Sequence, residues 1–128
     1  MSVIAVDIDG TATAAPEVFQ VLLKSLMDAG HEVYMLTGAL TSDSPGGTIS
    51  SRIEQLITCG LHRGIHFVDV HIFIDKDVRI IARMKADFCQ RHGAILFIDD
   101  SDLYQETVMV HSPNTFRLWP HAIRPSNR

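Results

Sequence analysis

The chain has 128 residues, of which 46% are hydrophobic and 20% charged, which is typical of one globular domain, residues 1–128, and argues against a disordered chain. A formal net charge of -4 argues against general nucleic-acid binding, because no basic field would attract a phosphate backbone. Cys59 and Cys89 have no spacing typical of a disulfide framework or a zinc site. The apolar opening ends at Asp7, too early for a signal peptide or a membrane span, so we expect a cytoplasmic protein with no membrane partner.

Apolar runs and helical patterns alternate along the chain. Three helices are predicted from apolar residues at helical spacing, each followed by a glycine: Pro16–Ala29, Ser51–Cys59 and Val78–His92. Continuous apolar runs predict buried strands over Val3–Val6, Val33–Leu36 and Ala94–Ile98, with a further strand, whose ends the pattern does not define, within Ile65–Ile74. The polar, glycine-rich stretch Leu40–Ser50 is predicted to be a loop.

This order of elements predicts the fold class. Strands that are apolar throughout and alternate with helices indicate an α/β fold, a three-layer, Rossmann-like parallel sheet with helices on both faces. Ligands bind such sheets in the crevice beyond the carboxyl ends of the strands. Asp7, Thr37 and the Asp99-Asp100 pair each follow a predicted strand, so we expect them to gather at one edge.

Asp7 and Asp9 are separated by one residue and follow the first predicted strand. Two carboxylates this close are costly to remove from water without a cation, and Mg²⁺ binds such groups together with waters and phosphate oxygens. Gly10 allows a sharp turn here and leaves room for a phosphoryl group. The alternative is an ordinary solvated turn, in which Asp and Gly are common.

Asp99 and Asp100 form a second acidic pair, followed by Asp102. These acids have two interpretations. They can begin a helix, where Asp is favourable at the cap and in the first turn, and Asp102 needs no other explanation. The pair can also share a divalent cation with the first two acids, which would relieve the crowded negative charge.

A phosphate site also needs hydrogen-bond donors and positive charge. The Thr37 hydroxyl and the Gly38 amide would supply donors at the end of the second strand, and Lys85 would supply the charge. Taken singly, Thr37 can be a turn former and Lys85 a solvated helix residue. Lys76 competes for the lysine role, but it lies between two aspartates, where a solvated charge cluster is the simpler explanation.

Four motifs in order, Asp7-Ile8-Asp9-Gly10-Thr11, Thr37-Gly38, Lys85 and Asp99-Asp100, resemble those of the haloacid dehalogenase-like (HAD) hydrolase superfamily. The resemblance extends from Val3 to about Asp102. It implies an enzyme, a Mg²⁺-dependent phosphatase that hydrolyses phosphomonoesters through an aspartyl-phosphate.

The resemblance also implies residue roles. Asp7 would be the nucleophile, and Asp9 the general acid and base. Mg²⁺ would be bound by the Asp7 carboxylate, the Asp9 carbonyl and Asp100, with Asp99 as an auxiliary acid. The phosphate-binding residues would be Gly10, Thr11, Thr37, Gly38 and Lys85.

The spacing of the motifs leaves no room for the cap domain that this superfamily usually carries. An open site implies a large or loosely held phosphorylated substrate, or closure by a second subunit of a homo-oligomer. Small metabolites, nucleotides and macromolecular phosphate ends all fit this description. The loop Leu40–Ser50 and the arginine-bearing tail Arg117–Arg128, where a local basic patch can form, are the candidates for specificity.

Two alternatives belong to other functional classes. A two-component receiver domain uses similar residues, but it places its acidic pair after the first strand and its threonine and lysine late, whereas here the threonine comes second and the stronger acidic pair last. The other alternative is a catalytically silent relative of the HAD superfamily that serves as a binding or interaction module.

Overall fold

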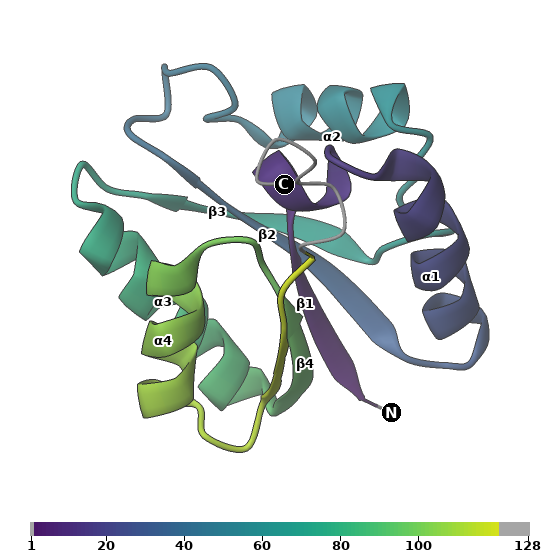
Figure 1. Ribbon diagram of the computed structural model, residues 1–128. Helices are drawn as coiled ribbons and strands as arrows, with labels where there is room; N and C mark the ends of the chain where they lie inside the picture. Colours follow the sequence, from purple (N-terminus) through teal and green to yellow (C-terminus); the bar gives the residue numbers. More distant parts are fainter. Residues whose placement is uncertain (1, 121–128) are drawn as a thin grey trace, which may run out of the picture.

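The computed structural model describes residues 2–120 and contains one five-stranded sheet in the order β3-β2-β1-β4-β5 (Figure 1). All four strand pairs are parallel. The predicted α/β class, a Rossmann-like sheet between helices, is therefore confirmed. The strands are β1 (Val3–Asp7), β2 (Glu32–Ala39), β3 (Asp69–Ile74), β4 (Ala94–Ile98) and β5 (Phe116–Leu118).

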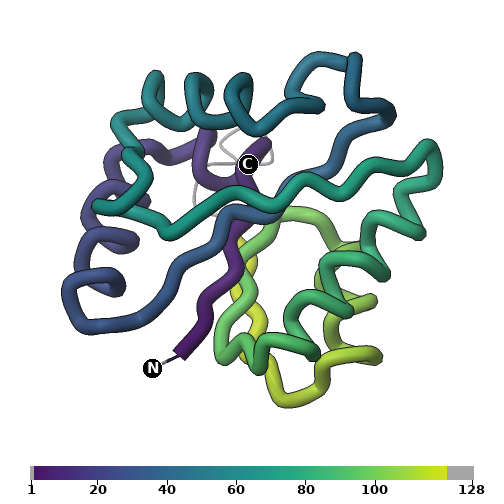
Figure 2. Tube along the Cα trace, turned by 180° about the vertical axis from the view of Figure 1, so that it is seen from behind, coloured from purple at the N-terminus to yellow at the C-terminus, as the bar shows by residue number. Residues whose placement is uncertain are grey.

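Two helices cover each face of the sheet, as the views from the front and from behind both show (Figures 1 and 2). On one face, α1 (Pro16–Asp28) and α2 (Ile49–Thr58) pack on a core that includes Phe19, Leu23 and Leu56. On the other, α3 (Val78–His92) and α4 (Asp102–His111) pack on a core that includes Phe88 and Val108. Both cores are apolar, so burial of these side chains holds the three layers together.

The order of the strands determines where a ligand can bind. The chain runs outward from β1 through β2 to β3, then returns to the other side of β1 with β4. The direction of winding therefore reverses between β1 and β4, and in open α/β sheets the crevice at such a switch point is the usual binding site. A wide turn, η1 (Ile8–Ala12), follows β1 at this point and is closed by the Thr13 amide, which donates to the Ile8 carbonyl at 3.1 Å.

Side-chain caps fix the start of the helices that flank this edge. The Asp77 carboxylate accepts from the Arg79 amide at 2.9 Å at the start of α3, and the Ser101 hydroxyl accepts from the Tyr104 amide at 3.3 Å at the start of α4. The helix α3 ends at Gly93, whose φ of 61° is in the left-handed region that glycine adopts without strain.

The structure differs from the predicted elements in several places, and α2 begins at Ile49, within the predicted loop Leu40–Ser50. The strand β2 continues through Thr37 and Gly38, because both pair with β3. Only the last six residues of Ile65–Ile74 form a strand. The sequence pattern did not predict α4 as a helix of this length or the short strand β5, which pairs with β4 at the edge of the sheet. Of the tail Arg117–Arg128, residues 121–128 lie outside the described part of the chain.

The intervals that could hold a cap domain contain only elements of the core. Between β1 and β2 the chain forms η1 and α1, and between β2 and β3 it forms a loop and α2. No cap is inserted in either interval, as predicted. Within residues 2–120, no helix combines the length and the apolar character that crossing a bilayer requires.

Candidate functional site

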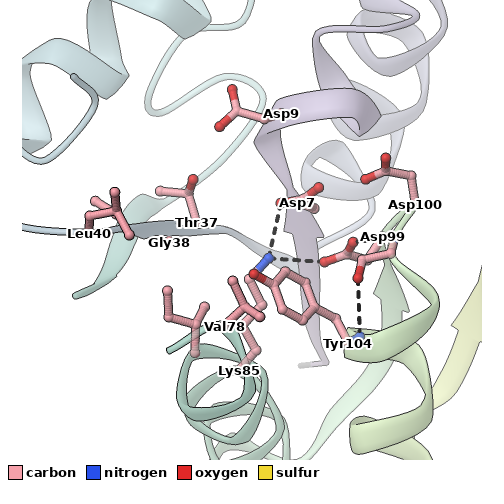
Figure 3. Close-up of a pocket in the computed structure, with 13 residues that line it drawn as sticks. Asp7, Asp9, Thr37, Gly38, Leu40, Val78, Lys85, Asp99, Asp100 and Tyr104 are labelled. Atoms are coloured by element: carbon pink, nitrogen blue, oxygen red, sulfur yellow. Dashed lines mark hydrogen bonds and ion pairs between the residues drawn. The ribbon is translucent and has the colours of Figure 1, made fainter. Parts of the chain in front are cut away.

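A pocket of about 320 Å³ lies at the carboxyl ends of β1, β2 and β4 (Figure 3). Its position is the one expected from the switch in strand order. Most of the residues singled out from the sequence line it. The lining residues are Asp7, Asp9, Thr37, Gly38, Ala39, Leu40, Val78, Ile81, Lys85, Asp99, Asp100, Ser101 and Tyr104.

Lys85 is the fully buried cation of this pocket. Its Nζ lies 3.0 Å from Oδ1 of Asp7 and 3.0 Å from Oδ2 of Asp99, and 4.3 Å from the centroid of the Tyr104 ring. Burial alone would lower the pKa of Lys85, but the two carboxylates outweigh burial and raise it, so the ammonium stays charged. Lys76, the competing lysine, is exposed and does not line the pocket.

Three carboxylates gather at this edge of the sheet, and two of them, Asp7 and Asp99, contact the ammonium. Asp7, Asp99 and Asp100 each place a carboxylate oxygen within 4.8 Å of the others. Burial raises the pKa of Asp7 to about 7, with Lys85 opposing the rise and Asp99 adding to it, and burial also raises the pKa of Asp99. Three ionised carboxylates against one ammonium would leave negative charge in excess, and this donor set fits a hard divalent cation such as Mg²⁺, which often binds through one or two carboxylates and keeps several waters.

Asp99 and Asp100 are not equivalent. The Asp99 carboxylate is fully buried and is already bound by Lys85 Nζ and by the Ser101 amide, which donates at 2.9 Å. Asp100 is half-buried. Its position at the end of β4, opposite Asp7, makes it the better placed of the two to bind an ion in the pocket directly.

Thr11 connects the two acidic strand ends. Its buried hydroxyl accepts from the Asp100 amide at 3.1 Å, and it lies 3.1 Å from Oδ2 of Asp7 and 3.1 Å from Oδ1 of Asp100, one of which accepts its proton. Neither Thr11 nor Gly10 lines the pocket. The structure thus places both behind the acids, where they support Asp7 and Asp100, instead of in the predicted position against a phosphate.

Gly10 has a steric role in this support. Its φ is 76°, and a Cβ atom built on it would lie 2.5 Å from Oδ2 of Asp100. Both the left-handed backbone and the close approach of the carboxylate therefore require glycine.

Asp9 is the predicted site residue that the structure turns away from Asp7, as Figure 3 shows. Its Oδ2 lies 2.8 Å from Nη1 of Arg52, and its Oδ1 accepts from Nε2 of Gln55 at 2.7 Å. Partial burial would raise the pKa of Asp9, but the hydrogen bonds from Gln55 and Arg52 outweigh it and lower the pKa. A carboxylate held in this way is not placed to exchange a proton at Asp7.

The sequence pattern did not single out Arg52 or Gln55, although both lie in the predicted helix Ser51–Cys59. The contacts with Asp9 span 43 and 46 residues, a distance at which no local pattern operates. One signal was available: Arg52 precedes the buried Leu56 by one helical turn, so a charged residue lies on the apolar side of α2.

Thr37, Gly38 and two apolar side chains form the remaining wall of the pocket. Glycine is required at position 38, because a Cβ there would lie 2.9 Å from Cγ2 of Ile81. Leu40 and Val78, at the rim, are 58% and 53% exposed. The pocket therefore has a charged floor and an apolar rim.

Comparison with known proteins gives relatives by structure only. No family model matches the sequence, and neither does any curated protein. The universal stress protein from Archaeoglobus fulgidus in complex with dAMP is 14% identical, with 93% of this chain and 97% of that chain covered and a TM-score of 0.57. A universal stress protein in complex with cAMP is 9% identical, with 94% and 96% covered and a TM-score of 0.58.

These neighbours contradict the assignment to the HAD superfamily, and with it the predicted phosphatase activity and the enzyme class. The silent HAD relative is not supported either. The physical reason is that residues at the carboxyl ends of β1, β2 and β4 meet at one edge of any sheet with this order, so the order of the motifs reflects topology.

The receiver alternative also fails, because receivers have the strand order 2-1-3-4-5. At these identities the comparisons establish the fold, a three-layer parallel α/β sheet of the kind found in universal stress proteins.

Proposed function

We propose that the chain binds a small phosphorylated ligand of the size of a nucleoside monophosphate, with Mg²⁺ between the phosphate and the carboxylates of Asp7 and Asp100. The observation that carries the proposal is the cluster of three carboxylates and one buried ammonium on the floor of the pocket. Solved structures with the same fold include complexes with dAMP and cAMP, which supports a nucleotide as the ligand.

The metal side of the site would use few protein ligands. Mg²⁺ commonly takes one or two carboxylates and completes its shell with waters and phosphate oxygens. Asp7 and Asp100 would be these carboxylates. Asp99, which is already bound to Lys85, would act behind them by holding the ammonium in place.

The phosphate would lie between the metal and the end of β2. The Thr37 hydroxyl and the main chain at Gly38 line this side of the pocket, and Lys85 adds a positive charge from the floor. Because Lys85 Nζ already donates to Asp7 and Asp99, its contribution would be the attraction of its charge for the phosphate, while Thr37 and Gly38 would donate the hydrogen bonds.

The rest of the ligand would face the apolar rim. A volume of about 320 Å³ is at the small end of the range for ligand pockets, which favours a mononucleotide over a dinucleotide. Leu40 and Val78 expose large apolar side chains at the mouth, where a nucleobase would cover them.

Isothermal titration calorimetry with adenosine 5′-monophosphate (AMP) tests the proposal. We expect binding in Mg²⁺ and its loss in EDTA. Asp100→Asn, which keeps the shape and removes the charge, should weaken Mg²⁺-dependent binding, whereas the matched control Asp87→Asn, on the exposed side of α3, should not. Failure to bind AMP in Mg²⁺, or equal binding in EDTA, would overturn the proposal.

A further inference from the structure

We infer that Arg52 is a positioning residue. It orients the part of the pocket that would hold the nucleotide, and it does so independently of the part that would hold Mg²⁺. This inference rests on the proposed function. Arg52 does not line the main pocket. Its buried guanidinium holds together three segments that line or flank the pocket: the turn after β1, the end of β2 and the loop before α2.

The contacts of Arg52 use almost all of its donors. Nε donates to the Gly46 carbonyl at 2.8 Å and Nη2 to the Gly38 carbonyl at 3.0 Å. Nη1 donates to Oδ2 of Asp9 at 2.8 Å and to Oε1 of Gln55 at 2.9 Å. The side chain is only 6% exposed. A planar fork with five N–H groups can satisfy this set, whereas the three donors of a lysine ammonium cannot reach it in the same geometry.

The neighbouring chain is shaped around the guanidinium. Gly46 has a φ of 77°, and a Cβ atom there would lie 2.6 Å from Cζ of Arg52. The Thr48 hydroxyl accepts from the Ser51 amide at 3.2 Å and begins α2 at the position that places Arg52 in its first turn. Backbone carbonyls and a glycine thus surround the guanidinium, and they fix its position.

The Arg52–Asp9 pair also controls the charge of the pocket. Asp9 lines the pocket and its side chain is 59% exposed, so an unpaired carboxylate would repel a phosphate there. The guanidinium offsets this charge. It also holds the Gly38 carbonyl, and through it the strand end that carries Thr37 and Leu40. No hydrogen bond within residues 2–120 joins Arg52 to Asp7, Asp99 or Asp100, so the proposed metal ligands are supported separately.

The inference predicts a split between two affinities. Arg52→Lys keeps the charge but not the fork, and it should weaken AMP binding at saturating Mg²⁺ by about tenfold or more, as is typical when the residues that orient a site are lost. The affinity for Mg²⁺ alone should not change. Gly46→Ala should give the same split, because it displaces the guanidinium without removing it, and it keeps the test usable if an Arg52 variant is unstable.

Two further variants make the test specific. Arg83→Met, which removes an arginine that is 56% exposed on α3, is the control and should change neither affinity. Asp9→Asn added to Arg52→Met should recover part of the lost AMP affinity, because it removes the charge that Arg52 no longer offsets. Calorimetry should be paired with circular dichroism to show that each variant is folded.

The outcomes separate this inference from the proposed function. A wild-type chain that binds no AMP in Mg²⁺ overturns both. A wild-type chain that binds AMP, with Arg52→Lys and Gly46→Ala binding equally well, overturns the role of Arg52 alone. A parallel loss of Mg²⁺ and AMP affinity in the folded variants also overturns it, because Arg52 would then support the whole site.

Discussion

The Thr11 hydroxyl accepts a hydrogen bond at 3.1 Å from the amide of Asp100, a residue 89 positions later in the chain. The same oxygen lies within hydrogen-bond distance of the carboxylates of Asp7 and Asp100. One buried side chain thus fixes the ends of β1 and β4 relative to each other at the switch point of the sheet. The spacing of the two proposed metal ligands depends on this link.

Thr11→Val should therefore weaken both stability and Mg²⁺ binding. Valine has nearly the same shape but cannot accept from the Asp100 amide, and a buried donor without a partner costs about 1–3 kcal/mol. We expect a loss of this size in urea unfolding and a lower affinity for Mg²⁺. Thr11→Ser, which keeps the hydroxyl, should lose much less. Equal stability of the Val and Ser variants would show that the link has no energetic role.

Two glycines with similar backbone angles allow strain and contact to be separated. Gly10 has a φ of 76° and Gly30 a φ of 92°, but only at Gly10 would a Cβ meet a neighbour, Oδ2 of Asp100 at 2.5 Å. Alanine should cost about 1–2 kcal/mol at either site through the left-handed backbone. Only Gly10→Ala should also displace Asp100 and lower the affinity for Mg²⁺, measured by calorimetry. If Gly30→Ala reduced Mg²⁺ binding to the same extent, the contact would not be the cause.

Removal of the buried ammonium should be the most destabilising single change in the pocket. Lys85→Met leaves Asp7 and Asp99 buried without their cation, and breaking a buried pair in this way typically costs about 3–5 kcal/mol. Urea unfolding at neutral pH measures the loss. Lys24→Met removes a lysine that is 57% exposed and paired with Asp28 on α1, and it should change stability little. Similar losses in the two variants would contradict the assigned role of Lys85.

The sequence allowed the residues at the strand ends to be predicted, but not the contacts that those residues make with one another. Asp7 and Thr37 could be placed at one edge because a parallel sheet brings the carboxyl ends of its strands together, and Lys85 could be placed on a helix by the apolar spacing of α3. The orientation of Asp9 could not be predicted, because it depends on a contact with Arg52 across 43 residues. The family was wrongly predicted for a related reason: residue types at strand ends are set by sheet topology as well as by ancestry.

The short strand β5 shows the same limit in the fold. It has only three residues, too few to establish a period, and its apolar side chains Phe116 and Leu118 are 65% and 43% exposed, so no buried apolar run marks it as a strand. It forms because β4 offers a free edge. On that edge, Leu96 and Ile98 pair with the first and the last residue of β5. A strand that is defined by its partner alone leaves no periodic signal in its own sequence.

His66 should make stability depend on pH. It is 7% exposed, and its Nδ1 accepts from the His62 amide at 3.0 Å. Burial lowers the pKa of His66 from its ordinary value of 6.5. Below pH 6.5 the unfolded chain therefore binds more protons at this site than the folded chain, and the free energy of unfolding falls as the pH falls.

The variant His66→Asn tests this dependence, because the Asn carbonyl can accept the same hydrogen bond and does not titrate. Urea unfolding between pH 7 and pH 5 should show a smaller loss of stability for the variant than for the wild type. Parallel curves for the two proteins would mean that His66 does not contribute to the pH dependence.

The apolar rim should determine which phosphorylated ligands bind well. Leu40→Ser and Val78→Ser remove the apolar surface that a nucleobase would cover, so each should weaken AMP binding while leaving the binding of ribose 5-phosphate, which has no base, unchanged. Calorimetry in Mg²⁺ measures both ligands. Val110→Ser, at a position that is 65% exposed on α4 and does not line the pocket, is the matched control. If the rim variants lowered both affinities equally, the rim would act on the phosphate-binding end of the pocket and not on the base. A loss confined to AMP would identify Leu40 and Val78 as the surface that distinguishes a nucleotide from a sugar phosphate.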